Sequence, residues 1–153
     1  MKTKIHAIAG ALATLTIFIF LASTLISELF GSHELIAAVK KAIVMPGLFI
    51  LIPCIIATGG SGFNLSQSRG GRIVQTKMKR MPFIGANGVL VLIPCALILN
   101  HWAANGQFDT TFYLVQALEI LAGITNLTLL SLNMRDGLKL TGKLSPKRAA
   151  KTA

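Results

Sequence analysis

Four long runs of apolar residues, separated by polar segments, dominate the pattern of this chain. The runs do not alternate between apolar and polar positions as barrel strands do: Ile17-Phe18-Ile19-Phe20-Leu21, for example, is apolar throughout. A helix rises ~1.5 Å per residue, so about 20 residues cross a hydrocarbon core of ~30 Å. The pattern therefore predicts four transmembrane helices, over residues 5–27, 38–58, 82–102 and 111–133.

Composition supports this prediction. Hydrophobic residues make up 53% of the chain and charged residues only 13%, whereas charged residues make up about 25% of a typical soluble domain. We predict an all-α fold, an integral membrane bundle of four helices. Residues 1–138 would form the transmembrane domain and residues 139–153 a basic cytoplasmic tail.

The distribution of basic residues predicts the orientation, because Lys and Arg in short loops favour the cytoplasmic side. Only Lys40 and Lys41 fall on the other side of the predicted membrane. We therefore expect both termini to be cytoplasmic. The remaining 13 of the 15 basic residues are Lys2, Lys4, Arg69, Arg72, Lys77, Lys79, Arg80, Arg135, Lys139, Lys143, Lys147, Arg148 and Lys151.

The net charge of +10 does not require a nucleic-acid partner, because the orientation bias accounts for the excess of basic residues. Anionic lipid headgroups are the expected partner, at roughly 1 kcal/mol per basic residue near the surface. An acidic surface on a partner protein is the alternative. The residues expected to make these contacts are Arg69, Arg72, Lys77, Lys79 and Arg80.

Small and polar residues recur on one face of two predicted helices, and such residues mark the faces along which membrane helices pack. Their steps of three and four residues keep them on one side of a helix. The fourth helix has Gln116, Glu119, Gly123, Asn126, Leu130 and Asn133 on this face. The first has Ala7, Gly10, Thr14, Ile17, Leu21, Thr24 and Glu28.

Prolines interrupt the two middle helices at Pro46, Pro53 and Pro94. An internal proline removes a backbone donor and kinks the helix. We expect the prolines to shape the bundle; the alternative is that the kinks open a cavity or a hinge.

Glu119 is the only carboxylate deep within a predicted span, where an acid costs about 2.5–3.5 kcal/mol on insertion scales. We expect it to be neutral and to bond helices together through Gln116 or a facing Thr or Asn. The alternative is that Glu119 handles a proton, a cation or an amine substrate, with Gln116, Asn126 and His101 as the further candidate ligands.

His101 is the candidate for haem ligation, since a b-type haem needs two axial ligands at similar depth. Its possible partners at that depth are His33 and Met45. We expect no cofactor, with haem b as the alternative. The sequence does not identify any other metal.

Enzyme signatures are absent from the sequence. There is no HExxH or GxSxG, and the segment Thr58-Gly-Gly-Ser-Gly-Phe lacks the Gly-Lys-Ser/Thr ending of a nucleotide-binding loop. We expect this segment to be a flexible cytoplasmic loop, and the protein not to be an enzyme.

Three segments on this four-span layout carry a resemblance: Thr58-Gly-Gly-Ser-Gly-Phe, Lys79-Arg-Met-Pro-Phe-Ile with Ala86-Asn-Gly, and Leu132-Asn-Met-Arg-Asp-Gly. Together they resemble small bacterial inner-membrane proteins without an assigned function. The resemblance implies a multi-pass protein of the bacterial inner membrane and brings no catalytic residues.

The sequence thus favours a non-enzymatic subunit, self-associating or accessory to a membrane complex. Two alternatives stay open: a small proton- or cation-coupled transporter using Glu119, and a haem electron carrier using His101.

Overall fold

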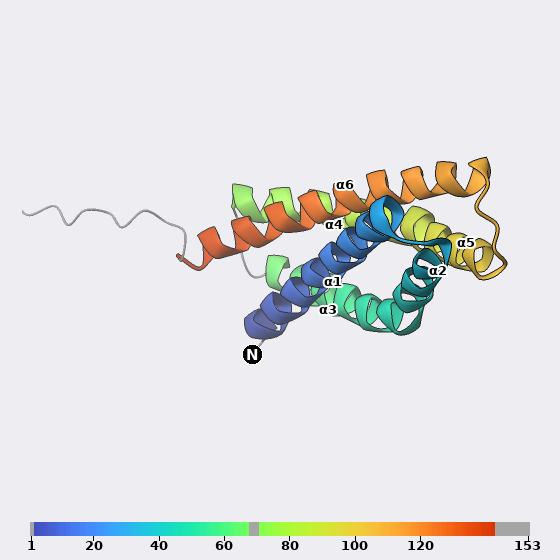
Figure 1. Ribbon diagram of the computed structural model, residues 1–153. Helices are drawn as coiled ribbons and strands as arrows, with labels where there is room; N and C mark the ends of the chain where they lie inside the picture. Colours follow the sequence, from blue (N-terminus) through green and yellow to red (C-terminus); the bar gives the residue numbers. More distant parts are fainter. Residues whose placement is uncertain (1, 68–70, 143–153) are drawn as a thin grey trace, which may run out of the picture.

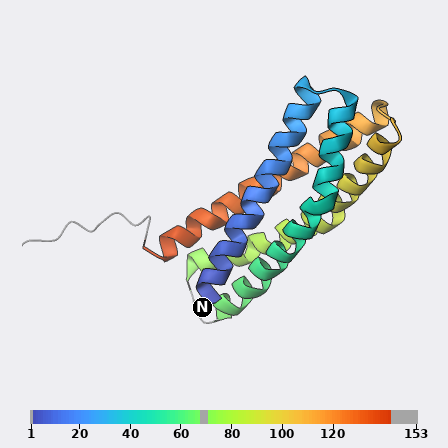
Figure 2. The same ribbon diagram turned by 60° about the horizontal axis from the view of Figure 1, so that its bottom comes forward.

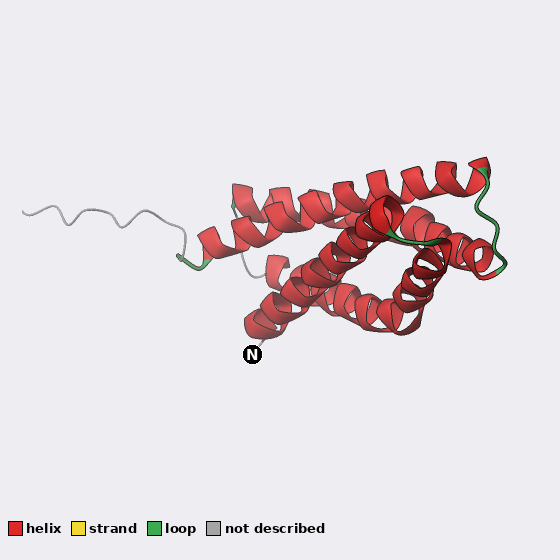
Figure 3. Ribbon diagram, viewed as in Figure 1, coloured by secondary structure: helices red, strands yellow, loops and turns green. Residues whose placement is uncertain are grey.

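The computed structural model describes residues 2–67 and 71–142, and all regular structure in these ranges is helical (Figures 1 and 3). Four helical segments are long and apolar enough to span a membrane, which confirms the predicted fold class. The first is α1 (Lys2–Phe30); the second joins α2 (His33–Ala42), η1 (Ile43–Gly47) and α3 (Leu48–Gln67). The third joins α4 (Arg72–Asn87), η2 (Gly88–Leu92) and α5 (Ile93–Ala104), and the fourth is α6 (Thr110–Leu140).

The chain passes up and down, so that the start of α1, the end of α3, the start of α4 and the end of α6 lie together (Figure 2). This end of the bundle carries Arg72, Lys77, Lys79 and Arg80, and we call it the basic end. Short connections at residues 31–32 and 105–109 form the opposite end.

The helices are longer than the hydrophobic pattern predicted, and the expected flexible loop at Thr58-Gly-Gly-Ser-Gly-Phe is wrong. This segment is helical, because α3 continues to Gln67. Its last glycine, Gly62, serves close packing. The Nδ1 atom of His6 on α1 lies 3.1 Å from both the Thr58 carbonyl oxygen and the Ser61 Oγ. A Cβ atom at Gly62 would lie only 3.1 Å from the His6 ring.

Both middle spans change helical form next to prolines, as the sequence suggested. In η1, Met45 has non-helical dihedral angles (φ −140°, ψ 112°) directly before Pro46. In η2, which ends two residues before Pro94, the Ile93 N–H bonds to the Gly88 carbonyl, five residues back. Such π-helical turns widen a helix locally and often occur at functional sites. Pro53 lies inside the continuous helix α3.

Packing follows the predicted face of α6. Gln116, Gly123, Asn126, Leu130 and Asn133 are buried, and Glu119 is half-buried. On α1 the predicted face is only partly correct. Ala7 is exposed, and the buried positions are Ala9, Ala13, Ile17, Thr24 and Ser27.

Two apolar clusters hold the spans together. The cluster nearer the basic end joins all four spans and consists of Ala13, Ile17, Leu48, Leu51, Ile84 and Leu130. The cluster at the opposite end consists of Ile36, Cys95, Leu99, Ala103 and Phe112. Large apolar side chains such as Phe49, Leu90 and Leu114 remain 67–73% exposed. A bilayer would cover this outer surface.

Candidate functional site

The short helix α2 directs a lysine side chain into the bundle. The Ser32 Oγ accepts a hydrogen bond from the Leu35 N–H and so caps the start of α2. Ile36 and Lys40, one helical turn apart, form its buried face. Lys41 remains exposed. Lys40 was expected at the opposite membrane surface, and this expectation is wrong: its side chain is 0% exposed.

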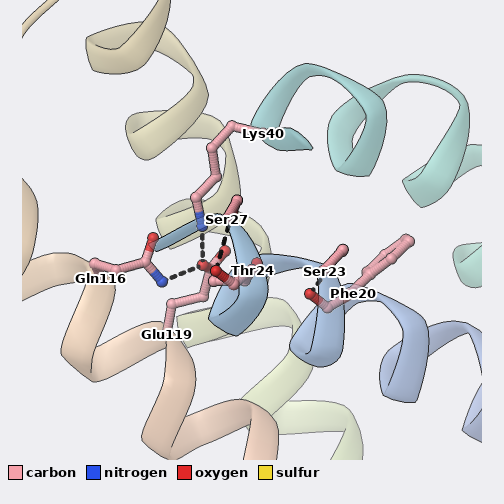
Figure 4. Close-up of polar contacts among 7 residues, drawn as sticks. All are labelled: Phe20, Ser23, Thr24, Ser27, Lys40, Gln116 and Glu119. Carbon is pink, nitrogen blue, oxygen red and sulfur yellow. Dashed lines mark hydrogen bonds and ion pairs between the residues drawn. The ribbon is translucent and has the colours of Figure 1, made fainter. Parts of the chain in front are cut away.

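Lys40 forms an ion pair with Glu119, which connects the second span to the fourth (Figure 4). The Nζ atom of Lys40 lies 2.5 Å from the Glu119 Oε2. Gln116, one turn away on α6, donates a second hydrogen bond to the same oxygen at 3.0 Å. The predicted contact between Gln116 and Glu119 is therefore confirmed, but the main partner of Glu119 is a cation.

A second carboxylate lies close enough to interact with this pair. Glu28 of α1 interacts electrostatically with Lys40, Glu119 and His33. Among the described residues, the Glu28 Oε1 and the Gln116 Oε1 are buried and have no hydrogen-bond partner. These acceptor atoms beside two carboxyl groups suit a proton or a small cation.

Burying these ionisable side chains within a membrane protein costs free energy. Removing two charges from water costs several kcal/mol per ion, and their attraction compensates only when the remaining polar atoms are also satisfied. Here two neighbouring oxygens, Oε1 of Glu28 and Oε1 of Gln116, have no partner among the described residues. An apolar contact between the same helices would be easier to accommodate, so ionisable residues at such a position indicate a functional site.

A cavity of about 230 Å³ lies beside the ion pair. All four spans contribute to its wall, which is mainly apolar and includes Ile17, Leu51, Gly85 and Leu92. Glu119 also lines the cavity. The alternative interpretation of the proline kinks, that they open a cavity, is therefore consistent with the structure.

Asn126, the third predicted ligand, has a packing role in this structure. It is fully buried. Its Oδ1 accepts a hydrogen bond from Asn87 at 2.9 Å, and its Nδ2 donates one to the Ile84 carbonyl oxygen at 3.2 Å. These bonds join α6 to α4. Asn126 shares the cavity wall with Glu119, but their side chains are not hydrogen bonded to each other in the described structure.

His101 lies apart from this group, near the opposite end. It is exposed, and its backbone oxygen accepts a hydrogen bond from the Asn105 side chain at 2.8 Å. His33 instead stacks on Phe108, with ring centroids 4.1 Å apart. Within residues 2–67 and 71–142, no group of three or more His, Cys, Asp or Glu side chains could hold a metal ion. The expectation of no cofactor, with haem b as the alternative, stays a prediction.

The basic residues predicted to contact headgroups do not behave alike. Arg72 and Lys79 are exposed, as that role requires, and Lys77 is half-buried. Arg80 is partly exposed and also has a partner within the bundle: its Nη1 pairs with the Asp136 Oδ2 on α6 at 2.8 Å and lies 3.4 Å from the Asn133 Oδ1. This pairing satisfies an acid that water reaches poorly. Arg69 lies outside the described residues.

Sequence reasoning missed two partners, Lys40 and Asp136. Lys40 lay inside the predicted span 38–58, and a lone acid in another span was a signal to look for a base at similar depth. Asp136 continues the polar face of α6, three residues after Asn133. Comparisons with models of protein families, with curated proteins and with solved structures found no match.

Proposed function

We propose that the protein is a non-enzymatic, multi-pass membrane protein that binds a proton or a monovalent cation at the Lys40–Glu119 pair and passes it through the bundle. The observation that carries this proposal is the buried pair itself. It has a second carboxyl group, that of Glu28, beside it and borders an internal cavity. The Lys40 ammonium acts as an internal cation that occupies Glu119 when no other cation is bound.

In this mechanism, an arriving cation competes with Lys40 for the carboxylates. Glu28 and Gln116 offer the unpartnered oxygens that receive it. Once Glu119 is neutralised, the attraction between α2 and α6 weakens, because the pair is held mainly by charge. The kinked second span, with its break at Met45, supplies a place where α2 can shift relative to α3. Transport thus follows from binding at one site.

Flux into reconstituted vesicles tests the proposal. We expect wild-type protein to carry protons or a monovalent cation, and Glu119→Gln and Lys40→Met to lose this flux. Lys41→Met is the matched control, because Lys41 is the exposed neighbour of Lys40 on the same helix. Wild-type protein without flux for protons, sodium or potassium would refute the proposal. Unchanged flux in a folded Glu119→Gln variant would refute it as well.

We further propose the bacterial inner membrane as the location, with both termini in the cytoplasm. The resemblance noted in the sequence supports the location, and the collection of basic residues at one end of the bundle supports the orientation. Single cysteines at Asn105 and Gln67, in a background lacking Cys54 and Cys95, test the orientation. An impermeant thiol reagent should label position 105 in intact cells and leave position 67 unlabelled.

The expectation of a self-associating or accessory subunit stays a prediction. It does not conflict with cation binding, because a subunit of a larger complex can contain an ion site. The molecular mass of the particle purified in mild detergent tests it directly. A single chain with no other protein bound would contradict this expectation and leave the cation proposal intact.

A further inference from the structure

The cavity owes its space to glycines on the third span. Gly85 of α4 and Gly88 of η2 both line it. A Cβ atom added at Gly85 would meet nothing within 4 Å, and one at Gly88 would meet only the Asn126 side chain, at 3.8 Å. A larger residue would therefore fit at Gly85 and occupy part of the cavity. The backbone here leaves open a volume that ordinary side chains would fill.

The cavity opens sideways, between the second and third spans. Three residues that line it are also exposed on the outside of the bundle: Ile52 (38%) and Ile56 (68%) on α3, and Val89 (62%) on η2. Closer to the basic end α3 contacts α4, and closer to the opposite end α2 contacts α5. The opening therefore lies between these contacts, at a depth where a bilayer presents acyl chains.

We infer that this cavity holds one acyl chain of an anionic phospholipid, which enters from the bilayer between α3 and η2. The length of the cavity agrees with the length of one acyl chain. The cavity wall on the third span extends from Ile84 to Ala96, a distance of about 18 Å at the helical rise of 1.5 Å per residue. One leaflet supplies chains for half of a hydrocarbon core of ~30 Å, so a single chain matches this length.

Basic residues on α4, between the cavity and the basic end, select the headgroup. Arg72 and Lys79 are exposed on α4, towards the basic end. Lys79 lies six residues before Gly85, which corresponds to about 9 Å along the helix. A chain in the cavity therefore places its phosphate within reach of Lys79. The described residues provide no ion-pair partner for Arg72 or Lys79, so both charges are available to an anionic headgroup.

Native mass spectrometry tests this inference on the full chain, stripped of lipid in mild detergent and titrated with phosphatidylglycerol or phosphatidylcholine. We expect one phosphatidylglycerol per chain and weaker binding of phosphatidylcholine. Gly85→Leu fills the cavity and should weaken phosphatidylglycerol binding at least about tenfold, or ~1.4 kcal/mol. Gly60→Leu is the matched control, because Gly60 has open space around it but does not line the cavity.

The double variant Arg72→Gln/Lys79→Gln should reduce phosphatidylglycerol binding to the level of phosphatidylcholine, whereas Lys139→Gln, at an exposed lysine of α6, should not. If circular dichroism shows that Gly85→Leu is unfolded, Val89→Trp at the exposed rim replaces it. Wild-type binding by the folded cavity variant would overturn the inference. Equal binding of the two lipids by wild-type protein would overturn its anionic part. Neither result bears on cation flux.

Discussion

Within residues 2–67 and 71–142, two ion pairs connect spans of the bundle, and they differ in how far they are removed from water. Lys40 and Glu119 have side chains that are 0% and 12% exposed, whereas those of Arg80 and Asp136 are 22% and 11% exposed. The first pair lies beside the cavity and has unsatisfied oxygens near it. The second lies at the basic end, where Asn133 is close enough to add a hydrogen bond.

This difference separates a candidate functional pair from a structural one. A guanidinium at the basic end can keep contact with headgroups and water while it joins α4 to α6, so its charge costs little. An ammonium with no exposed surface depends on the acidic groups around it, here Glu119 in the ion pair and Glu28 nearby. The Arg80–Asp136 ion pair therefore stabilises the contact between α4 and α6, whereas the Lys40–Glu119 ion pair makes the contact between α2 and α6 sensitive to charge.

The largest predicted effect comes from removing one member of the buried pair. Glu119→Leu should lower the free energy of unfolding by about 3–5 kcal/mol, because it removes the carboxylate that forms the ion pair with buried Lys40. The double variant Lys40→Met/Glu119→Leu should recover most of this loss, since both charges are then gone. Denaturant unfolding in mild detergent measures all three proteins.

Lys41→Met, at the exposed neighbour, provides the control and should change stability little. Glu119→Gln, which keeps the shape and some hydrogen bonding, should lie between wild type and Glu119→Leu. A double variant as unstable as Glu119→Leu would show that the pair is not the reason for the loss. The contrast between the two ion pairs would then fail.

A hydrogen-bonded contact without charge, between α6 and α4, sharpens the comparison between the ion pairs. Asn126→Leu removes two hydrogen bonds between α6 and α4, and such bonds in membranes contribute about 0.6 kcal/mol on average and up to ~1.7. We expect a loss of about 1–2 kcal/mol in the unfolding free energy. Thr125→Val, on the exposed side of α6, is the control. A loss as large as that of Glu119→Leu would mean that burial, and not charge, sets the cost.

Much of the fold could be predicted because lipid imposes simple demands. Runs of about 20 apolar residues gave the four spans, and the spacing of small and polar residues gave the inner face of α6 almost residue by residue. The helix ends were harder. Gly59, Gly60 and Gly62 suggested a loop. Glycine is nevertheless tolerated within membrane helices where the chain packs closely, and Gly62 lies against the His6 ring.

The α6 residues of the candidate site were predicted from the sequence, but their partner Lys40 was not. Periodicity within one helix places Gln116, Glu119 and Asn126 on a common face, but it cannot show which side chain of another helix arrives there. Lys40 looked like a charge at the membrane surface because it stands next to Lys41 and close to Glu34 in sequence. Only the path of α2, turned inwards before the break at Met45, brings it to Glu119.

The smallest effect is predicted for the pair at the basic end, and its dependence on salt distinguishes it from the buried one. Arg80→Gln should cost at most about 1 kcal/mol, because Lys77 still interacts electrostatically with Asp136 and the Arg80 side chain, 22% exposed, is partly screened by water. The Debye length falls from ~30 Å at 0.01 M salt to ~3 Å at 1 M, so wild-type protein should lose this small contribution in high salt and Arg80→Gln should lose none. Arg135→Gln, at an exposed position of α6, should respond to salt like wild type.

Because Lys40 is sealed from solvent, the loss caused by Glu119→Leu should stay the same in both salt conditions. An equal salt response of the two pairs would contradict the distinction between them.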